Sequence, residues 1–167
     1  VAPQILEALE MAVPQGLHLP LVYNTGGYDS LATLRLLDGI FDIYMPDTKY
    51  ADPRIGRRYS KARQYPDFNQ AAVKEMHRQV GDLVVDENGI ARRGLLVRHL
   101  VLPEGIAGSE KVFEFIAREI SPNTYPNVMD PYRPGYRAAE HPPLARRITE
   151  AEFGAGLESA RRHGLAR

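Results

Sequence analysis

The chain has 167 residues, 44% of them hydrophobic and 25% charged, which is the composition of an ordinary globular domain. Lys and Arg together number 21, as do Asp and Glu, so the formal net charge is zero. A nucleic-acid-binding domain usually carries a basic excess, and a membrane span needs ~18 consecutive apolar residues, which no segment provides. We therefore expect neither a nucleic-acid partner nor a membrane partner.

The chain contains no cysteine. Within this polypeptide that absence excludes disulfides, zinc–thiolate sites, cysteine nucleophiles and thiolate-held iron–sulfur clusters. Residues 1–4 have neither the basic nor the apolar segment of a signal peptide, so we expect a cytoplasmic protein. A first residue other than Met indicates a chain that begins inside a longer protein.

The first predicted elements are a helix and a strand. Apolar residues at helical spacing predict a helix over residues 5–13, with Gly16 as its C-terminal cap. The apolar run 19–23 predicts a buried strand, which ends in a polar, glycine-rich turn at 24–27.

A second helix and strand follow at once. Asp29 or Ser30 is expected to cap a helix over 31–37 whose leucines pack inward. The next strand is expected over 41–45 and ends in the polar residues 46–49.

The middle of the chain adds a long excursion and a hairpin. Residues 50–66 form the excursion, and Asp67 is expected to cap a helix over 67–80. The Asn-Gly pair at 88–89 predicts a small β-hairpin. Residues 94–102 form the clearest strand of the sequence.

The last third continues the alternation. Ser109 is expected to cap a helix, and 124–129 is a weaker strand. A Tyr/Pro-rich loop over 131–147 then leads to a terminal helix over about 149–163 with a Thr-x-x-Glu capping box. Strand–helix repeats to about residue 130 predict a parallel α/β fold in one domain spanning 1–167. About four strands are visible, too few to close a barrel of ~8.

Each predicted strand becomes polar or glycine-rich at its carboxyl end, the edge where α/β proteins bind ligands. Asn24, Thr25 and Gly26 suit close approach of a ligand to the backbone, or simply form a strand-to-helix turn. Asp47 and Lys49 have one residue between them and project to the same side. They could hold a zwitterionic ligand or a cation, or form a salt bridge with each other.

Arg98 lies inside an otherwise apolar strand, where a charge is expensive unless it is paired or meets an anionic ligand. Strand alternation places Arg98 and His99 on opposite faces, and we interpret His99 as a structural residue. The loop with Asp130, Tyr132 and Arg133 suits an adenine or a peptide partner, or is a packed surface loop. No spacing of zinc ligands is present, so we expect no metal site.

The ordered segments 24–28, 45–50 and 98–105 resemble the radical S-adenosylmethionine family, in the branch of pyruvate formate-lyase activating enzymes. The resemblance covers nearly the whole chain. It implies a partial (β/α)6 TIM-like barrel, of which this chain is the carboxyl-terminal part with a small β-hairpin insertion. It also implies a 4Fe-4S cluster, held by a Cys-x-x-x-Cys-x-x-Cys loop before the matched region, and radical cleavage of S-adenosylmethionine. The radical takes hydrogen from a partner, typically a glycyl-radical enzyme.

The resemblance also assigns residues to the cofactor. Asn24 and Thr25 would lie near its ribose and methionine, Arg98 near its methionine carboxylate, and the backbone from Val101 onward near the adenine. The implied cofactor-binding set is Asn24, Thr25, Gly26, Met45, Asp47, Lys49, Arg98, Val101, Asp130 and Tyr132; no catalytic residue or metal ligand is implied in this chain.

The sequence departs from the family in three places. The cluster motif and the Gly-Gly-Glu segment that holds the amino group are absent, Gly26 replaces a frequent serine, and Gly135 replaces a frequent cysteine. We therefore expect this polypeptide alone to be inactive. One alternative is a non-catalytic binding or scaffold domain derived from the barrel, which uses residues 54–63 and the Tyr-rich loop for a protein partner. Another is a phosphate- or sugar-binding α/β enzyme.

Overall fold

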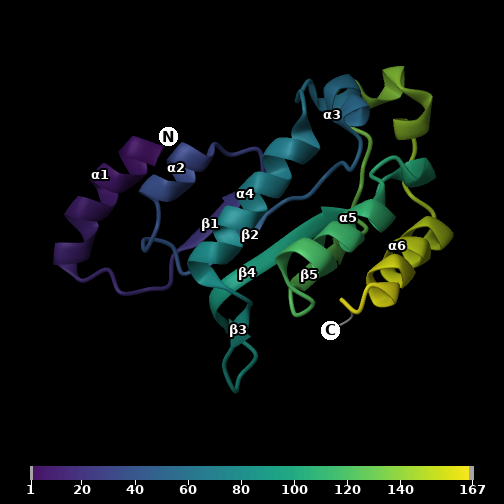
Figure 1. The fold of residues 1–167 in the computed structure, drawn as a ribbon. Helices are drawn as coiled ribbons and strands as arrows, with labels where there is room; N and C mark the ends of the chain where they lie inside the picture. Colours follow the sequence, from purple (N-terminus) through teal and green to yellow (C-terminus); the bar gives the residue numbers. More distant parts are fainter. Residues whose placement is uncertain (1, 166–167) are drawn as a thin grey trace.

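The computed structural model describes residues 2–165, which form an α/β fold around one five-stranded sheet. Four strands are parallel and adjacent in chain order, and β3 pairs antiparallel with the start of β4 (Figure 1). The strands are β1 (Val22–Thr25), β2 (Ile43–Pro46), β3 (Val84–Val85), β4 (Ala91–Leu100) and β5 (Tyr125–Met129). The predicted α/β class and the hairpin are confirmed.

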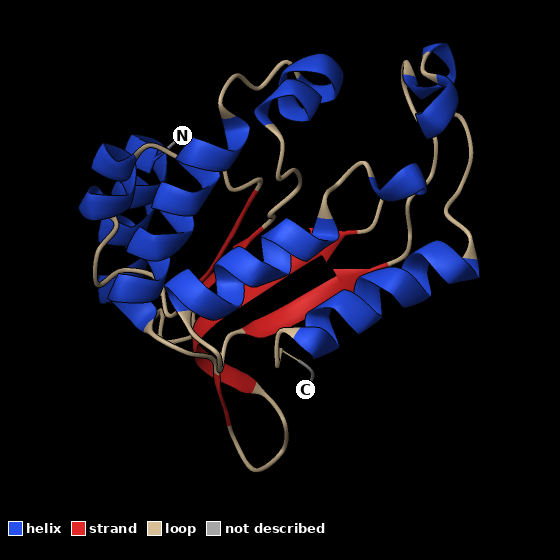
Figure 2. Cartoon of the chain, turned by 45° about the vertical axis from the view of Figure 1, so that its right-hand side comes forward, coloured by secondary structure: helices blue, strands red, loops and turns tan. Residues whose placement is uncertain are grey.

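Six α-helices within residues 2–165 accompany the sheet, and Figure 2 shows helices lying across one of its faces. They are α1 (Ala2–Ala12), α2 (Leu31–Leu36), α3 (Pro53–Ser60), α4 (Tyr65–Val80), α5 (Ser109–Phe115) and α6 (Glu150–Arg162). Short turns of 3-10 helix occur at Val13–Gln15, Pro103–Gly105, Ala138–Glu140 and Pro142–Leu144, and a π-helical turn at Ile116–Ile120 follows α5. None of the helices within residues 2–165 is both long and apolar enough to cross a membrane.

The two faces of the sheet differ in burial. Tyr44, Leu95 and Val97 are fully buried on the face that α4 covers. The strand register places the alternate residues on the opposite face, where Val22 is 47% exposed and Asn127 is also exposed. The core therefore lies between the sheet and its helices, and the other face is open.

The first strand differs from the prediction. It begins at Val22 rather than residue 19 and is not buried, because it is the edge of the sheet and pairs only with β2 within the described chain. The apolar residues that suggested a buried strand are largely exposed, and Leu19 is 67% exposed. The apolar run thus predicted the element but not its environment.

The predicted inward-facing residues of the second helix were also partly wrong. Ser30 caps α2 as expected, but Leu36 is 67% exposed while Leu34 and Leu37 are buried. A helix has only one inward stripe, and four leucines over seven residues cannot all share it. The excursion 50–66, in which no element was predicted, contains α3.

Two predicted N-caps were wrong. Asp67 lies inside the first turn of α4, which starts after Gln64, a residue with φ of 52°. Ser109 is the first residue of α5 and does not cap it, because its hydroxyl bonds to His99 instead. The capping box at Thr149 and the Gly16 cap, with φ of 99°, are both confirmed.

Candidate functional site

The carboxyl ends of β1, β2 and β4 bring four predicted side chains together. Arg98 Nη2 lies 2.7 Å from Asp47 Oδ1 and donates to Asn24 Oδ1 at 2.7 Å. The second carboxylate oxygen, Asp47 Oδ2, pairs with Lys49 Nζ. These four residues, the Asp47 cluster, form one continuous network of charges and an amide.

Strand geometry explains why these side chains meet. Asp47 and Arg98 are paired in the parallel ladder, so they share a face of the sheet. That face is open, and the side chains of Asp47, Arg98 and Lys49 are 18%, 25% and 38% exposed. Partial access to water and the ion pairs offset the desolvation of Arg98 within its apolar strand. The salt bridge expected as one alternative for Asp47 and Lys49 is present.

Two side chains of α4 hold the turns that carry the cluster. The Tyr65 hydroxyl lies 3.0 Å from the carbonyl oxygens of both Gly26 and Asp47, which share its one proton, and accepts from the Lys49 amide at 3.1 Å. Asn69 Nδ2 donates to the carbonyls of Gly27 and Asp47, both at 2.9 Å. Burial raises the pKa of Tyr65, so the hydroxyl keeps its proton.

Tyr65 and Asn69 were missed from the sequence. They stand four residues apart and therefore share a face of α4, which is a signal that the sequence contains. The loops that this face contacts depend on the angle at which α4 crosses the sheet. The sequence does not indicate that angle.

Replacing Tyr65 by phenylalanine tests this support. The variant Tyr65→Phe keeps the ring but removes the hydroxyl, so the part-buried Lys49 amide and the Gly26 carbonyl lose this partner, while the Asp47 carbonyl keeps its bond from Asn69. We expect the free energy of unfolding to fall by about 1–3 kcal/mol, measured by urea denaturation. In the control variant Tyr28→Phe, the lost bond is an exposed one to the Arg63 carbonyl, so a loss below ~0.5 kcal/mol is expected. Equal losses would contradict the role of Tyr65.

The remaining residues predicted on β1 and β2 divide between the two faces. Met45 is in register with Asn24, so it lies on the face of the cluster and is half-buried. Gly26 adjoins Lys49, whose Nζ would lie 4.0 Å from a Cβ placed there. Thr25 points away, since its hydroxyl donates to Asp29 Oδ2 at 2.6 Å.

The predicted residues after β4 and β5 do not join the cluster. The Val101 side chain is buried against Gly156 of α6, and its amide donates to the Met129 carbonyl at 3.0 Å. Asp130 is exposed, and the Tyr132 hydroxyl donates to the Leu144 carbonyl at 2.8 Å. Both residues border a separate hollow of about 360 Å³.

Asn127 is a further residue that sequence reasoning missed. It is the ladder partner of Arg98 on β5, so its exposed side chain lies beside the cluster on the same face. The alternation of β5 restricts Asn127 to one of two faces. The register with β4 decides which face, and that register is set by tertiary packing.

His99 has the structural role that we predicted. It is fully buried on the face opposite Arg98. Its Nδ1 lies 2.6 Å from the Thr48 carbonyl and so carries the proton, and Nε2 accepts from the Ser109 hydroxyl at 2.9 Å. Burial lowers its pKa to about 4. Among residues 2–165, no group of three or more His, Cys, Asp or Glu is arranged to hold a metal ion.

Comparison with known proteins shows that the chain is similar to an archaeal protein. No family model matches the chain. An uncharacterized protein of Methanocaldococcus jannaschii is 33% identical to it over 164 residues. The match covers 98% of this chain and 44% of the archaeal protein, so the chain spans less than half the length of this relative.

Proposed function

We propose that the chain is a portion of a radical S-adenosylmethionine enzyme resembling the pyruvate formate-lyase activating enzymes, and that the Asp47 cluster positions the cofactor. The observation that carries this proposal is the convergence of Asn24, Asp47, Lys49 and Arg98. All four belong to the set that the family resemblance assigns to the cofactor, and they come from the ends of three separate strands.

The sheet supports a partial barrel as the finer description of the fold. Doubly wound sheets reverse their strand order, whereas barrel strands follow one another around the sheet. The parallel strands β1, β2, β4 and β5 are neighbours in chain order, without a reversal. A carboxyl-terminal part of a (β/α)6 barrel would have this order, with the β3–β4 hairpin as an insertion.

The β1 edge supports the same proposal, because preceding barrel strands would cover it. Apolar side chains left exposed usually mark a surface that something covers. More than half of the large exposed hydrophobic residues lie in residues 11–36, around α1, β1 and α2 at one end of the molecule (Figure 1). They are Met11, Val13, Leu19, Val22, Tyr28, Leu31 and Leu36.

The chemistry of the Asp47 cluster fits the methionine end of S-adenosylmethionine, which carries an ammonium and a carboxylate group. Arg98 Nε is buried without a hydrogen-bond partner, so this guanidinium has a donor left for such a ligand, whereas Asp47 Oδ1 already forms an ion pair with Arg98 Nη2. Two cations and one carboxylate give the cluster a net charge of +1, which suits a carboxylate. Arg98 and Lys49 would bind that carboxylate, and Asp47 and Asn24 would orient the ligand.

The cofactor supplies radical hydrogen abstraction when it is bound to a 4Fe-4S cluster. This chain has no cysteine, so the thiolates for that cluster would come from another part of a full-length protein. The role of this chain is to bind, orient and shield. A glycyl-radical enzyme as protein substrate and a cytoplasmic location belong to the same proposal.

The reading frame before Val1 gives the most direct test. We expect it to encode three closely spaced cysteines in the pattern Cys-x-x-x-Cys-x-x-Cys, followed by a Gly-Gly-Glu segment. A frame that continues upstream without such cysteines would contradict the proposal. It would instead favour the alternative, a non-catalytic binding domain, which is consistent with the internal ion pairs of Asp47 with Lys49 and Arg98.

Binding of S-adenosylmethionine to this chain alone is expected to be weak. Without the cluster the chelation of the amino and carboxylate groups is lost, so we expect a dissociation constant above ~1 mM. Isothermal titration should therefore detect no micromolar binding, and micromolar affinity would contradict this account. At millimolar ligand, amide NMR shifts at residues 47–49 should appear in the parent and in the control Arg118→Ala, and be lost in Arg98→Ala.

A further inference from the structure

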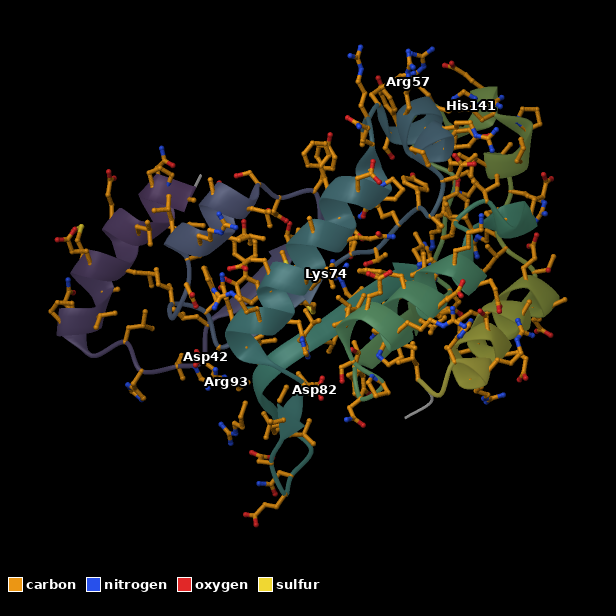
Figure 3. All side chains as sticks on the ribbon, in the orientation of Figure 1. Asp42, Arg57, Lys74, Asp82, Arg93 and His141 are labelled. Carbon is orange, nitrogen blue, oxygen red and sulfur yellow. The ribbon has the colours of Figure 1, made fainter. Side chains whose placement is uncertain are left out.

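A second surface lies away from the Asp47 cluster, where the end of α3 meets the Tyr/Pro-rich loop. Figure 3 shows Arg57 and His141 at this end of the molecule. The two segments line a hollow of about 570 Å³, the basic groove, with Arg58, Tyr59, Lys61, Tyr132, Arg133 and Tyr136 among its walls. The groove is separate from the cofactor residues proposed above, except that Tyr132 borders it.

The segments that line the groove carry a local excess of positive charge. Residues 50–64 and 131–147 contain nine Lys and Arg against two carboxylates, an excess of seven positive charges. The whole chain has a formal net charge of zero, so the other residues together have a net charge of −7. This segregation is invisible in the overall composition.

Most of these cations have no acidic partner. Arg54 pairs with Asp52, Arg137 with Glu140, and Arg146 with Glu152. Within residues 2–165 the other six have no ion pair with a carboxylate, although ion pairs occupy most cations elsewhere in that range. The six are Arg57, Arg58, Lys61, Arg63, Arg133 and Arg147, and all are exposed.

Aromatic rings lie between these charges. The Arg58 guanidinium lies 5.2 Å from the centre of the Tyr59 ring, and His141 contacts the same ring edge-on, with ring centres 5.2 Å apart. Tyr136 is 99% exposed and has φ of 51°, a left-handed conformation that is unfavourable for a tyrosine. Exposed Tyr and Arg side chains of this kind are the residues that dominate protein–protein interfaces.

We propose that the basic groove binds a short acidic segment of a partner protein. Carboxylates of the segment pair with Arg58, Lys61 and Arg133, and an apolar or aromatic side chain packs between Tyr59 and Tyr136. The proposal does not depend on the radical enzyme function, because a scaffold domain could use the same groove.

A peptide fits the charge distribution better than a nucleic acid. Duplex DNA carries one negative charge per ~1.7 Å along its axis and needs an extended basic track. Here the positive charge is concentrated in two segments at one end of the molecule, and the net charge of −7 on the rest of the chain repels a long polyanion. A hollow of about 570 Å³ accommodates a few side chains.

The experiment uses a fluorescein-labelled eight-residue peptide of alternating Glu and Tyr, with fluorescence anisotropy as readout. We expect binding that weakens steeply between 50 and 300 mM salt, since exposed ion pairs are screened. The double variant Arg58→Ala/Arg133→Ala should weaken binding by about tenfold. The control Arg118→Ala/Arg161→Ala removes two exposed cations on other surfaces and should change affinity less than about twofold.

Three results would overturn the proposal. Equally tight binding of an alternating Gln and Tyr peptide would show that charge does not drive binding. If the double variant binds the acidic peptide as tightly as the parent does, the peptide does not bind in the basic groove. An eight-nucleotide single strand that binds more tightly, and loses affinity in the double variant, would assign the surface to nucleic acid. Unchanged circular dichroism and thermal midpoint of both variants, expected because all four residues are exposed, exclude unfolding as the cause.

Discussion

The variant Gly27→Ala is expected to lose more than ~3 kcal/mol of unfolding free energy. Gly27 has φ of 73°, a left-handed conformation that disfavours any residue with a Cβ. A Cβ at this position would lie 2.1 Å from the Asp47 carbonyl oxygen and 2.3 Å from Asn69 Nδ2. One of these is backbone and the other an amide nitrogen that makes two hydrogen bonds, so neither can move without breaking the support of the Asp47 cluster.

A matched control separates the clash from the backbone conformation. Gly89 in the hairpin turn has φ of 76°, and nothing lies within 4 Å of a Cβ built there. The variant Gly89→Ala should therefore lose only about 1 kcal/mol, the cost of the left-handed backbone. Urea denaturation of both variants gives the two values. Losses of similar size would show that the turn after β1 is not held against Asp47 and Asn69.

Acid is expected to destabilise the protein through His99. Its pKa is about 4 in the fold and about 6.5 when unfolded, because the buried imidazole cannot be hydrated when charged. Between these values the unfolded chain binds a proton that the folded chain does not, so stability rises with pH. The contribution is complete above pH ~6.5 and falls by about 3 kcal/mol as the pH drops to ~4.

The variant His99→Gln isolates this effect. Glutamine does not titrate, so the stability of the variant should change less between pH 6.5 and 4 than that of the parent, by about 3 kcal/mol. Free energies of unfolding at several pH values provide the measurement. Identical slopes for parent and His99→Gln would contradict the prediction, whatever the absolute stability of the variant.

Strand periodicity allowed part of the candidate site to be predicted. Asp47 and Lys49 share a side because side chains alternate along an extended chain, and Arg98 and His99 separate for the same reason. Polar residues that follow each apolar run likewise indicate the candidate binding edge of the sheet. These inferences are local, since each needs only the backbone geometry of a few successive residues.

Predictions that depend on contacts between segments far apart in the chain were less accurate. The apolar run before β1 predicted burial, yet Leu19 and Val22 are exposed because no described strand lies beyond that edge. Asp67 and Ser109 have the residue types of caps, but the helix starts are set by Gln64 and Gly108 in left-handed conformations. Residue preference at a helix end is worth only about 1 kcal/mol, and tertiary contacts override it.

The sequence by itself determined the alternating elements, the parallel α/β class, the hairpin at Asn88–Gly89 and the four residues of the Asp47 cluster, because each follows from local periodicity or turn chemistry. Only the tertiary structure decided that Tyr65 and Asn69 brace the turns, that Asn127 stands beside Arg98, and that the cations of two remote segments share one groove. Register and helix crossing set these contacts, and both arise from packing between segments far apart in the chain.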